Sequence, residues 1–511
     1  MSEIQNHNPS PNDPDRYFRT DHIEADLKRR SLRGGFVTMV GQVGKFILRT
    51  ASTIILARLL TPQDYGLIGM VTVITGFLDQ FKDLGLSLAT IQRANINHKQ
   101  VSTLFWLNIG LSCGLVLLTI ALAPTIARFY GEPRLIWITI AIAAGFLIGG
   151  LAIQHQALLR RQMRFADLAA IDLTSMCVGL IVGTISAWYG LGYWSLVILL
   201  LSQTLTTTIG VWILCGWRPT WPVRHSGIRS MVTFGGNFTG FSLVNYFSRN
   251  MDNVIIGAYL GAEQLGLYAK AYQLLLLPID QIALPLRSVA IPTLCRLQND
   301  PKRYCAYYHK AILLMVSLGM PLVAFTMVTA NNLIRTLLGP QWTDAVQMFQ
   351  VLGVAAFLGT FNMAAGWVFI SFGRTDRQFY WSAISSALTV ISFIIGIRWG
   401  AIGVAAGYSI SRVLLQIPGI VYAYQDSPLR LKDLGSTIFQ PAISSIGAAI
   451  ALMGIHIWLL KSSEGAIYLL VDSVLYILLY FGIWIILPHG RQEIMSILGL
   501  LKDLRGKQKS V

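Results

Sequence analysis

The chain has 511 residues, of which 54% are hydrophobic and only 13% are charged. Soluble domains carry about 25% charged residues, so the composition excludes an ordinary soluble protein and predicts one that crosses a membrane many times. The net charge of +16 does not indicate nucleic-acid binding here, because cytoplasmic loops of membrane proteins collect Lys and Arg.

The N-terminal segment, residues 1–35, is polar and contains several prolines. It has no apolar stretch followed by a cleavage site, so we expect a cytoplasmic tail rather than a signal peptide. After it, apolar windows of about 20 residues predict about fourteen membrane-spanning helices. They lie near 36–59, 65–90, 101–126, 135–158, 167–189, 192–216, 230–259, 264–294, 308–337, 345–371, 379–398, 400–424, 435–460 and 466–488.

The charges of the connecting loops predict the orientation of these helices. Both tails and every second loop are rich in Lys and Arg, whereas the loops on the other side hold only Arg128, Arg134, Arg398 and Lys461. Positive loops stay in the cytoplasm, so both termini are expected there. The final segment, 489–511, either forms an amphipathic helix on the inner leaflet or is a simple basic tail.

The first and seventh predicted helices show an internal repeat at an offset of 200 residues. The seventh helix comes six helices after the first, so the two run through the membrane in the same direction. This indicates two lobes of the same direction, with a substrate path between them. We therefore expect an N-lobe over 36–216, a C-lobe over 230–424 and an additional helix pair over 435–488. The matched residues include Gly35 with Gly235, Arg49 with Arg249, Leu60 with Leu260, Gly66 with Gly266 and Leu67 with Leu267.

Charged residues occur in the middle of the two repeated helices. Lys45 and Arg49 are four residues apart and share a helix face, while Arg249 precedes Asp252 by three residues. A charge at the bilayer centre costs about 2.5–3.5 kcal/mol on insertion scales. These side chains are therefore expected to face either a partner or an aqueous cavity.

The same charges are also compatible with purely structural roles. Either Arg249 and Asp252 form an ion pair within one helix, or the acidic and basic residues of the second helix, Asp79, Lys82 and Asp83, pair with the cations of the first. Five further ionisable residues inside predicted helices are expected to be structural: Asp172, Asp280, Arg287, Arg412 and Asp472. Of the carboxylates, Asp83 and Asp280 are also candidates for an ion-coupling or charge-partner role, with Asp252.

Three prolines, Pro278, Pro285 and Pro292, recur every seven residues in the eighth predicted helix. Each removes a backbone hydrogen bond, so the helix is either a hinge that lines a cavity or a static kink. His155 and His456 are isolated histidines, for which a structural role is favoured over proton transfer. The five cysteines show no metal-binding or disulfide spacing, so neither a metal nor a catalytic cofactor is expected.

Several stretches resemble a known family of membrane proteins. GGNFTGFSLVNYFSRNMDNVIIGAYLGAEQLGLYAKAYQLLLLP (235–278), LARLLTPQDYGLIGM (56–70), DLGLSLATIQR (83–93), IPTLCRLQND (291–300) and LGPQW (338–342) are similar to motifs of Wzx-type polysaccharide flippases. These belong to the MOP exporter superfamily, and the likeness is to the colanic-acid-exporter branch.

The resemblance implies an all-α, MATE/MurJ-like fold with two six-helix lobes and a C-terminal helix pair that forms a groove for a lipid tail. It implies a flippase that moves polyprenyl-pyrophosphate-linked oligosaccharide across the bacterial inner membrane by alternating access, driven by an H⁺ or Na⁺ gradient. A polysaccharide polymerase and a chain-length regulator are its expected partners. Lys45, Arg49 and Arg249 would then bind the pyrophosphate, since Arg matches phosphate geometry, and Asp252 would hold Arg249 when the cavity is empty.

Two further functions compete with this one. A drug or cation antiporter of the same superfamily needs an acidic cavity, whereas the central charges here are net positive. A membrane polymerase needs a large outer loop with acid/base residues, and the outer loops here are short. No nucleotide-binding motif such as GxxxxGK[ST] occurs, so a transporter is expected rather than an enzyme.

Overall fold

A computed structural model of the chain describes Phe18 and residues 27–93, 96–222, 229–458, 465–488, 490–495 and 499. Side chains at 27–38, 229–245 and 247–249 are outside this description. The expected N-terminal tail and most of the expected C-terminal tail also lie outside the described residues.

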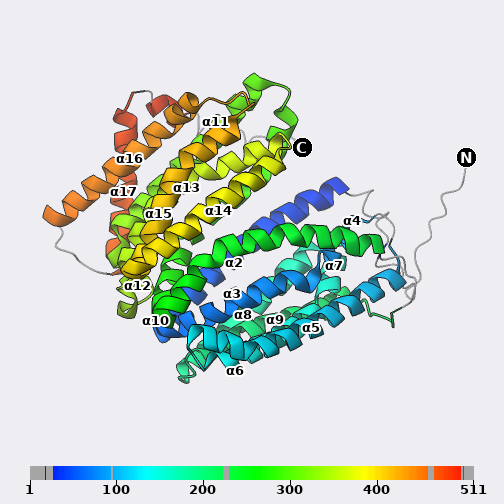
Figure 1. Ribbon diagram of the computed structural model, residues 1–511. Helices are drawn as coiled ribbons and strands as arrows, with labels where there is room; N and C mark the ends of the chain where they lie inside the picture. Colours follow the sequence, from blue (N-terminus) through cyan, green and yellow to red (C-terminus); the bar gives the residue numbers. More distant parts are fainter. Residues whose placement is uncertain are drawn as a thin grey trace, which may run out of the picture. The chain divides into compact units, whose positions relative to one another are not determined.

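The described residues are helical, with no strand among them, and they divide into two compact units, Met1–Glu263 and Gln264–Val511. In each unit long helices run alongside one another (Figure 1). The first unit contains α2 (Leu27–Leu59), α3 (Pro62–Asp83), α4 (Leu86–Gln92), α5 (His98–Tyr130), α6 (Leu135–Gly150), α7 (Ile153–Arg161), α8 (Phe165–Trp188), α9 (Trp194–Cys215) and the start of α10 (Arg229–Leu297).

The second unit contains the rest of α10 and the helices of the C-terminal half. These are α11 (Pro301–Val328), α12 (Ala330–Leu337), η2 (Pro340–Trp342), α13 (Ala345–Ser371), α14 (Thr375–Gly396), η3 (Ile397–Trp399), α15 (Gly400–Tyr424), α16 (Leu431–Trp458) and α17 (Ala466–Ile486). Contacts place residues 229–263 with the first unit, and the lobe boundaries expected from the sequence stay a prediction.

Local sequence signals fix where several helices begin. Thr61 and Asp64 form a capping box at the start of α3, with Pro62 in the first turn. Asn97 and Gln100 form another at the start of α5. Such boxes satisfy amide groups that have no partner within the helix. Helix α5 therefore starts a few residues before its apolar window at 101.

Three predicted helices are in fact broken. The segment 65–90 consists of α3 and α4, because Leu84 (φ 45°) and Gly85 (φ 67°) adopt left-handed backbone angles between them. The segment 135–158 divides into α6 and α7 around Leu151 and Ala152. The segment 308–337 divides into α11 and α12 at Thr329. Hydropathy does not detect these breaks, since it averages composition over a window and carries no information on backbone angles.

The proline-rich segment forms the second part of α10, which joins the seventh and eighth predicted helices. Within the described part of α10, the only non-helical backbone angles are at Gly261 (φ 83°), not at Pro278, Pro285 or Pro292. The hinge role of the three prolines stays a prediction.

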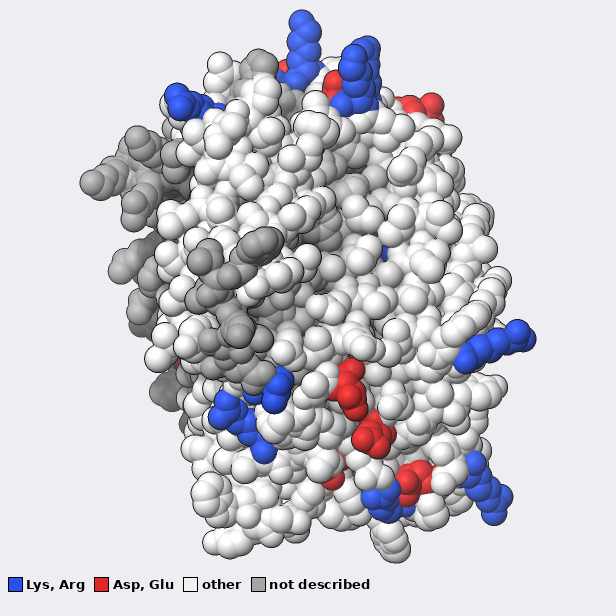
Figure 2. Space-filling model, turned by 90° about the vertical axis from the view of Figure 1, so that its left-hand side faces the viewer, with Lys and Arg blue, Asp and Glu red and all other residues white. Residues whose placement is uncertain are grey.

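The described helices include ten segments that are long and apolar enough to cross a membrane, among them 48- and 50-residue segments that each overlap two predicted helices. The expected number of fourteen stays a prediction. Many large apolar side chains are exposed, for example Ile486 at 83% and Trp188 at 78%, and most of the surface visible in Figure 2 is uncharged. Such a surface suits lipid rather than water, which confirms a multi-pass membrane protein.

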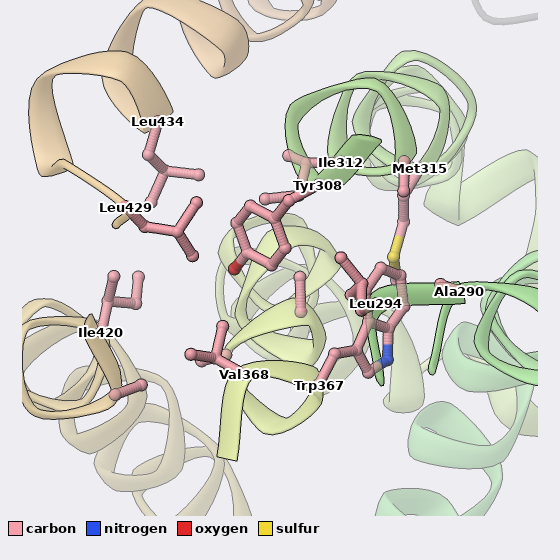
Figure 3. Packing of buried hydrophobic residues seen from close by; sticks show 14 of the residues in the cluster. Ala290, Leu294, Tyr308, Ile312, Met315, Trp367, Val368, Ile420, Leu429 and Leu434 are labelled. Carbon is pink, nitrogen blue, oxygen red and sulfur yellow. The ribbon is translucent and has the colours of Figure 1, made fainter. Parts of the chain in front are cut away.

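A dense core holds α10, α11, α13 and α15 together in the second unit (Figure 3). Tyr308, which is 1% exposed, lies at its centre with Leu429 and Val368 around it. Its hydroxyl group accepts a 3.2 Å hydrogen bond from Tyr424, so this buried polar atom is satisfied.

Candidate functional site

The first unit contains two adjoining polar cavities. The larger has a volume of about 430 Å³ and is bordered by α3, α4, α6, α7, α8 and α9. The smaller, of about 130 Å³, lies between α2, α7, α8 and α9. Gln156 and Arg160 of α7 line both. We call the two spaces together the N-unit cavity.

Both broken helices of the first unit border the larger cavity. Asp83 lines it where α3 ends, and its carboxylate accepts a 2.8 Å hydrogen bond from the backbone N–H of Ser87 in α4. Ala152 lines it at the break between α6 and α7, and α4 packs against α7. Broken helices at membrane depth are tolerated where they face protein or a cavity, and they are typical of transport sites.

Charged side chains of both signs line the N-unit cavity. Lys82 forms a 2.7 Å ion pair with Asp79 one turn away, and Lys45 of α2 forms an ion pair with Asp172 of α8. Arg160 is exposed and has no partner among the described residues. The lining thus combines three cations with three carboxylates: Lys45, Lys82, Arg160, Asp79, Asp83 and Asp172.

Neutral polar groups complete the wall of the larger cavity. The side chains of Gln156, Gln203 and Thr207 have no hydrogen-bond partner among the described residues, whereas Thr208 donates to the carbonyl of Ile148 at 2.9 Å. The unpartnered amides and hydroxyl group are available to a ligand. An amide both donates and accepts hydrogen bonds.

The predicted cationic residues have different environments. Lys45 lines the smaller cavity, while Arg49 is exposed, lines neither cavity and has no partner among the described residues. The side chain of Arg249 lies outside the description. Asp252 is 6% exposed, and its carboxylate accepts a 2.8 Å bond from the amide of Asn253. The role of these residues in substrate binding stays a prediction.

One alternative from the sequence is wrong for Lys45. Asp79 pairs with Lys82 and Asp83 with Ser87, so the carboxylates of the second predicted helix are engaged within α3 and α4. The partner of Lys45 is Asp172, which is 127 residues away. Asp280, the remaining charge-partner candidate, is exposed on α10 and is not without an interaction partner.

Sequence reasoning missed Arg160, Gln156 and Gln203. Arg160 was counted only among the positive charges of a loop, beside Arg161. The glutamines are uncharged, so they do not stand out in an apolar helix as a charged residue does. The two arginines differ in the structure, since Arg161 is 7% exposed and donates to the carbonyls of Thr90 and Ile91 at the end of α4.

The two isolated histidines also have defined positions. His155 is fully buried, stacks on Trp212 at a centroid distance of 4.5 Å and lies 3.2 Å from the carbonyl oxygen of Trp217, which favours the structural role expected for it. His456 of α16 lies 2.8 Å from the carboxylate of Asp472 on α17. It thus forms an interhelical pair that the sequence did not predict.

Comparison with solved structures shows which fold the chain has. The fold is similar to the lipid II flippase MurJ in an inward closed conformation, with a TM-score of 0.68 over 88% of this chain and 98% of that chain, at 16% identity. It is also similar to an inward-facing multidrug resistance MATE family transporter of the MOP superfamily, with a TM-score of 0.61 over 74% and 93% of the two chains, at 15% identity. The chain therefore has the MurJ/MATE-type membrane fold.

Sequence comparison then gives the family. Residues 55–347 match the family described as polysaccharide biosynthesis protein, and the chain belongs to that family. It is 23% identical to the lipopolysaccharide biosynthesis protein WzxC of Escherichia coli (strain K12) over 78% of this chain and 81% of that protein. It is 24% identical to the teichuronic acid biosynthesis protein TuaB of Bacillus subtilis (strain 168), over 84% of this chain and 90% of that protein.

Proposed function

We propose that this protein is a flippase that moves polyprenyl-pyrophosphate-linked oligosaccharide units across the membrane for the synthesis of a cell-surface polysaccharide. The observation that carries the proposal is a polar, ion-lined cavity at two broken helices, in a chain of the polysaccharide biosynthesis family. A large polar headgroup needs such a cavity, because the apolar core of the bilayer offers it no hydrogen bonds.

Membership of the family also favours a saccharide over a drug or metal cation. The N-unit cavity is lined by three cations and three carboxylates, so it lacks the excess of acidic groups that a cation exporter requires. Arg160 and Lys45 supply positive charge for a diphosphate, and Arg49 and Arg249 are proposed to add to it. Arg forks match phosphate oxygens in a two-point geometry.

The cellular setting follows from the same proposal. We place the protein in the bacterial inner membrane with both termini in the cytoplasm, because the tails carry the excess of Lys and Arg. Transport proceeds by alternating exposure of the binding site to the two sides of the membrane, driven by an H⁺ or Na⁺ gradient. Contact with a polysaccharide polymerase and a chain-length regulator is part of the same proposal.

A deletion strain tests the proposal in the cell. Loss of the protein is expected to stop surface polysaccharide production and to make lipid-linked oligosaccharide accumulate, measured by mass spectrometry of extracted lipids. The wild-type gene should restore both, and Arg160→Gln should restore them poorly at equal protein level. Unchanged lipid-linked oligosaccharide together with increased sensitivity to cationic drugs would contradict a flippase and indicate an antiporter.

A further inference from the structure

We propose that the larger cavity, which is lined by Gln156, Gln203 and Thr207, binds the sugar hydroxyl groups of the substrate rather than its pyrophosphate. In this way it sets which saccharide the protein accepts. This inference rests on the proposed function and adds to it a division of labour within the cavity.

The neutral polar groups of the wall suit a sugar. Gln156, Gln203 and Thr207 project from α7 and α9 and have no hydrogen-bond partner among the described residues. Amides and hydroxyls both donate and accept hydrogen bonds, as the hydroxyl groups of a sugar do. A ligand that leaves such partly buried groups unpaired is rejected, because unpaired polar groups carry a desolvation cost.

The charges of the larger cavity disfavour a diphosphate there. Lys82 is paired with Asp79 at 2.7 Å, and the Asp83 carboxylate also lines this space. The remaining cation of its lining, Arg160, is shared with the smaller cavity, where Lys45 lies. A pyrophosphate is therefore expected beside Arg160 and the smaller cavity, because deeper in the larger space it would meet the carboxylates of Asp79 and Asp83. Sugar hydroxyls, in contrast, donate to carboxylates in strong charge-assisted hydrogen bonds.

Two glycines make room for the polar wall. A Cβ atom at Gly179 of α8 would lie 2.3 Å from Cγ of Gln203, so the position of Gln203 requires a glycine there. A Cβ atom at Gly149 of α6 would lie 3.1 Å from Nζ of Lys82. The resulting volume of about 430 Å³ falls within the range of about 300–1,000 Å³ that is typical of small-molecule sites.

Binding measurements on the purified full-length protein test this assignment. The probes are undecaprenyl pyrophosphate without a sugar and the same lipid carrying glucose, galactose or N-acetylglucosamine. We expect the wild type to bind at least one glycosylated lipid about tenfold more tightly than the bare lipid. Gln203→Leu, which keeps the size and removes the amide, should reduce that preference about three- to tenfold and leave bare-lipid binding unchanged.

Gly179→Ala should have the same effect by displacing Gln203. Its matched control is Gly114→Ala in α5, where an added Cβ atom meets nothing within 4 Å, and thermal unfolding checks that each variant is folded. Equal binding of all four lipids by the wild type, or an equal loss of bare and glycosylated lipid in Gln203→Leu, would overturn the inference. Failure to bind any of the four would contradict the proposed function, and this inference with it.

Discussion

At the scale of single residues, the central feature is that the cations of the N-unit cavity differ in how they are held. Lys45 is paired with Asp172, Lys82 with Asp79, and Arg160 has no partner among the described residues. An anionic headgroup can engage Arg160 directly but must compete with Asp172 for Lys45. Under the proposed function, the Asp172 carboxylate would therefore lower the affinity of Lys45 for a phosphate group.

Substitutions of Lys45 and Asp172 should change the affinity for an anionic headgroup in opposite directions. Asp172→Asn removes the competing charge and should raise the affinity for undecaprenyl pyrophosphate about fivefold, which corresponds to about 1 kcal/mol for a partly exposed ion pair. Lys45→Gln should lower it. Binding to the purified protein at two salt concentrations measures both effects, and unchanged affinity in both variants would remove Lys45 from the binding site.

The sequence indicated some of the charged residues of the N-unit cavity, such as Lys45, but none of its neutral polar residues. Lys45 stood out because a charge inside an apolar helix needs compensation, but its partner Asp172 is 127 residues away and no local pattern connects them. Gln203 carries no charge and Gly179 is one of 46 glycines, so only the packing of α8 on α9 shows what they do.

At the scale of helices, the breaks between α3 and α4 and between α6 and α7 shape the cavity. The sequence predicted each pair as one continuous helix, because hydropathy records composition and not backbone angles. Leu84 in particular adopts a left-handed angle (φ 45°) that non-glycine residues rarely take. Arg161, by donating to carbonyls at the end of α4, stabilises the short helix that follows the break.

Two adjacent arginines should therefore respond differently to the same substitution. Arg161→Met leaves buried carbonyls unpaired and should destabilise the protein by about 2–4 kcal/mol, measured by unfolding in detergent. Arg160→Met should leave stability within about 0.5 kcal/mol, as for an exposed side chain without partners, and should lower transport. The reverse pattern would contradict both assigned roles.

The helix pair α16–α17 gives a second prediction at this scale. Asp472 is 3% exposed and lies 2.8 Å from His456, so His456→Leu removes the partner of a buried carboxylate. We expect a loss of about 1–3 kcal/mol in the free energy of unfolding. The double variant His456→Leu/Asp472→Leu should recover most of it, and additive losses would show that the two side chains do not interact.

At the scale of the whole molecule, hydropathy and loop charge were sufficient to predict an all-helical, multi-pass membrane protein. Every predicted helix overlaps a helix of the structure, and the expected fold class agrees with the likeness to MurJ. The two-lobe arrangement with a central path stays a prediction, and it rests on a weak repeat at an offset of 200 residues. The orientation and the number of spanning helices rest on charge and composition alone.

Translocation in a purified system tests the central claim most directly. The protein is reconstituted into liposomes that carry a labelled polyprenyl-pyrophosphate-linked oligosaccharide only in the inner leaflet, and an externally added glycosidase releases the label from molecules that reach the outer leaflet. With an ion gradient imposed, wild-type liposomes should release label well above protein-free liposomes, and Arg160→Gln should release much less. Release at the protein-free rate by folded wild-type protein, with and without each gradient, would contradict the account.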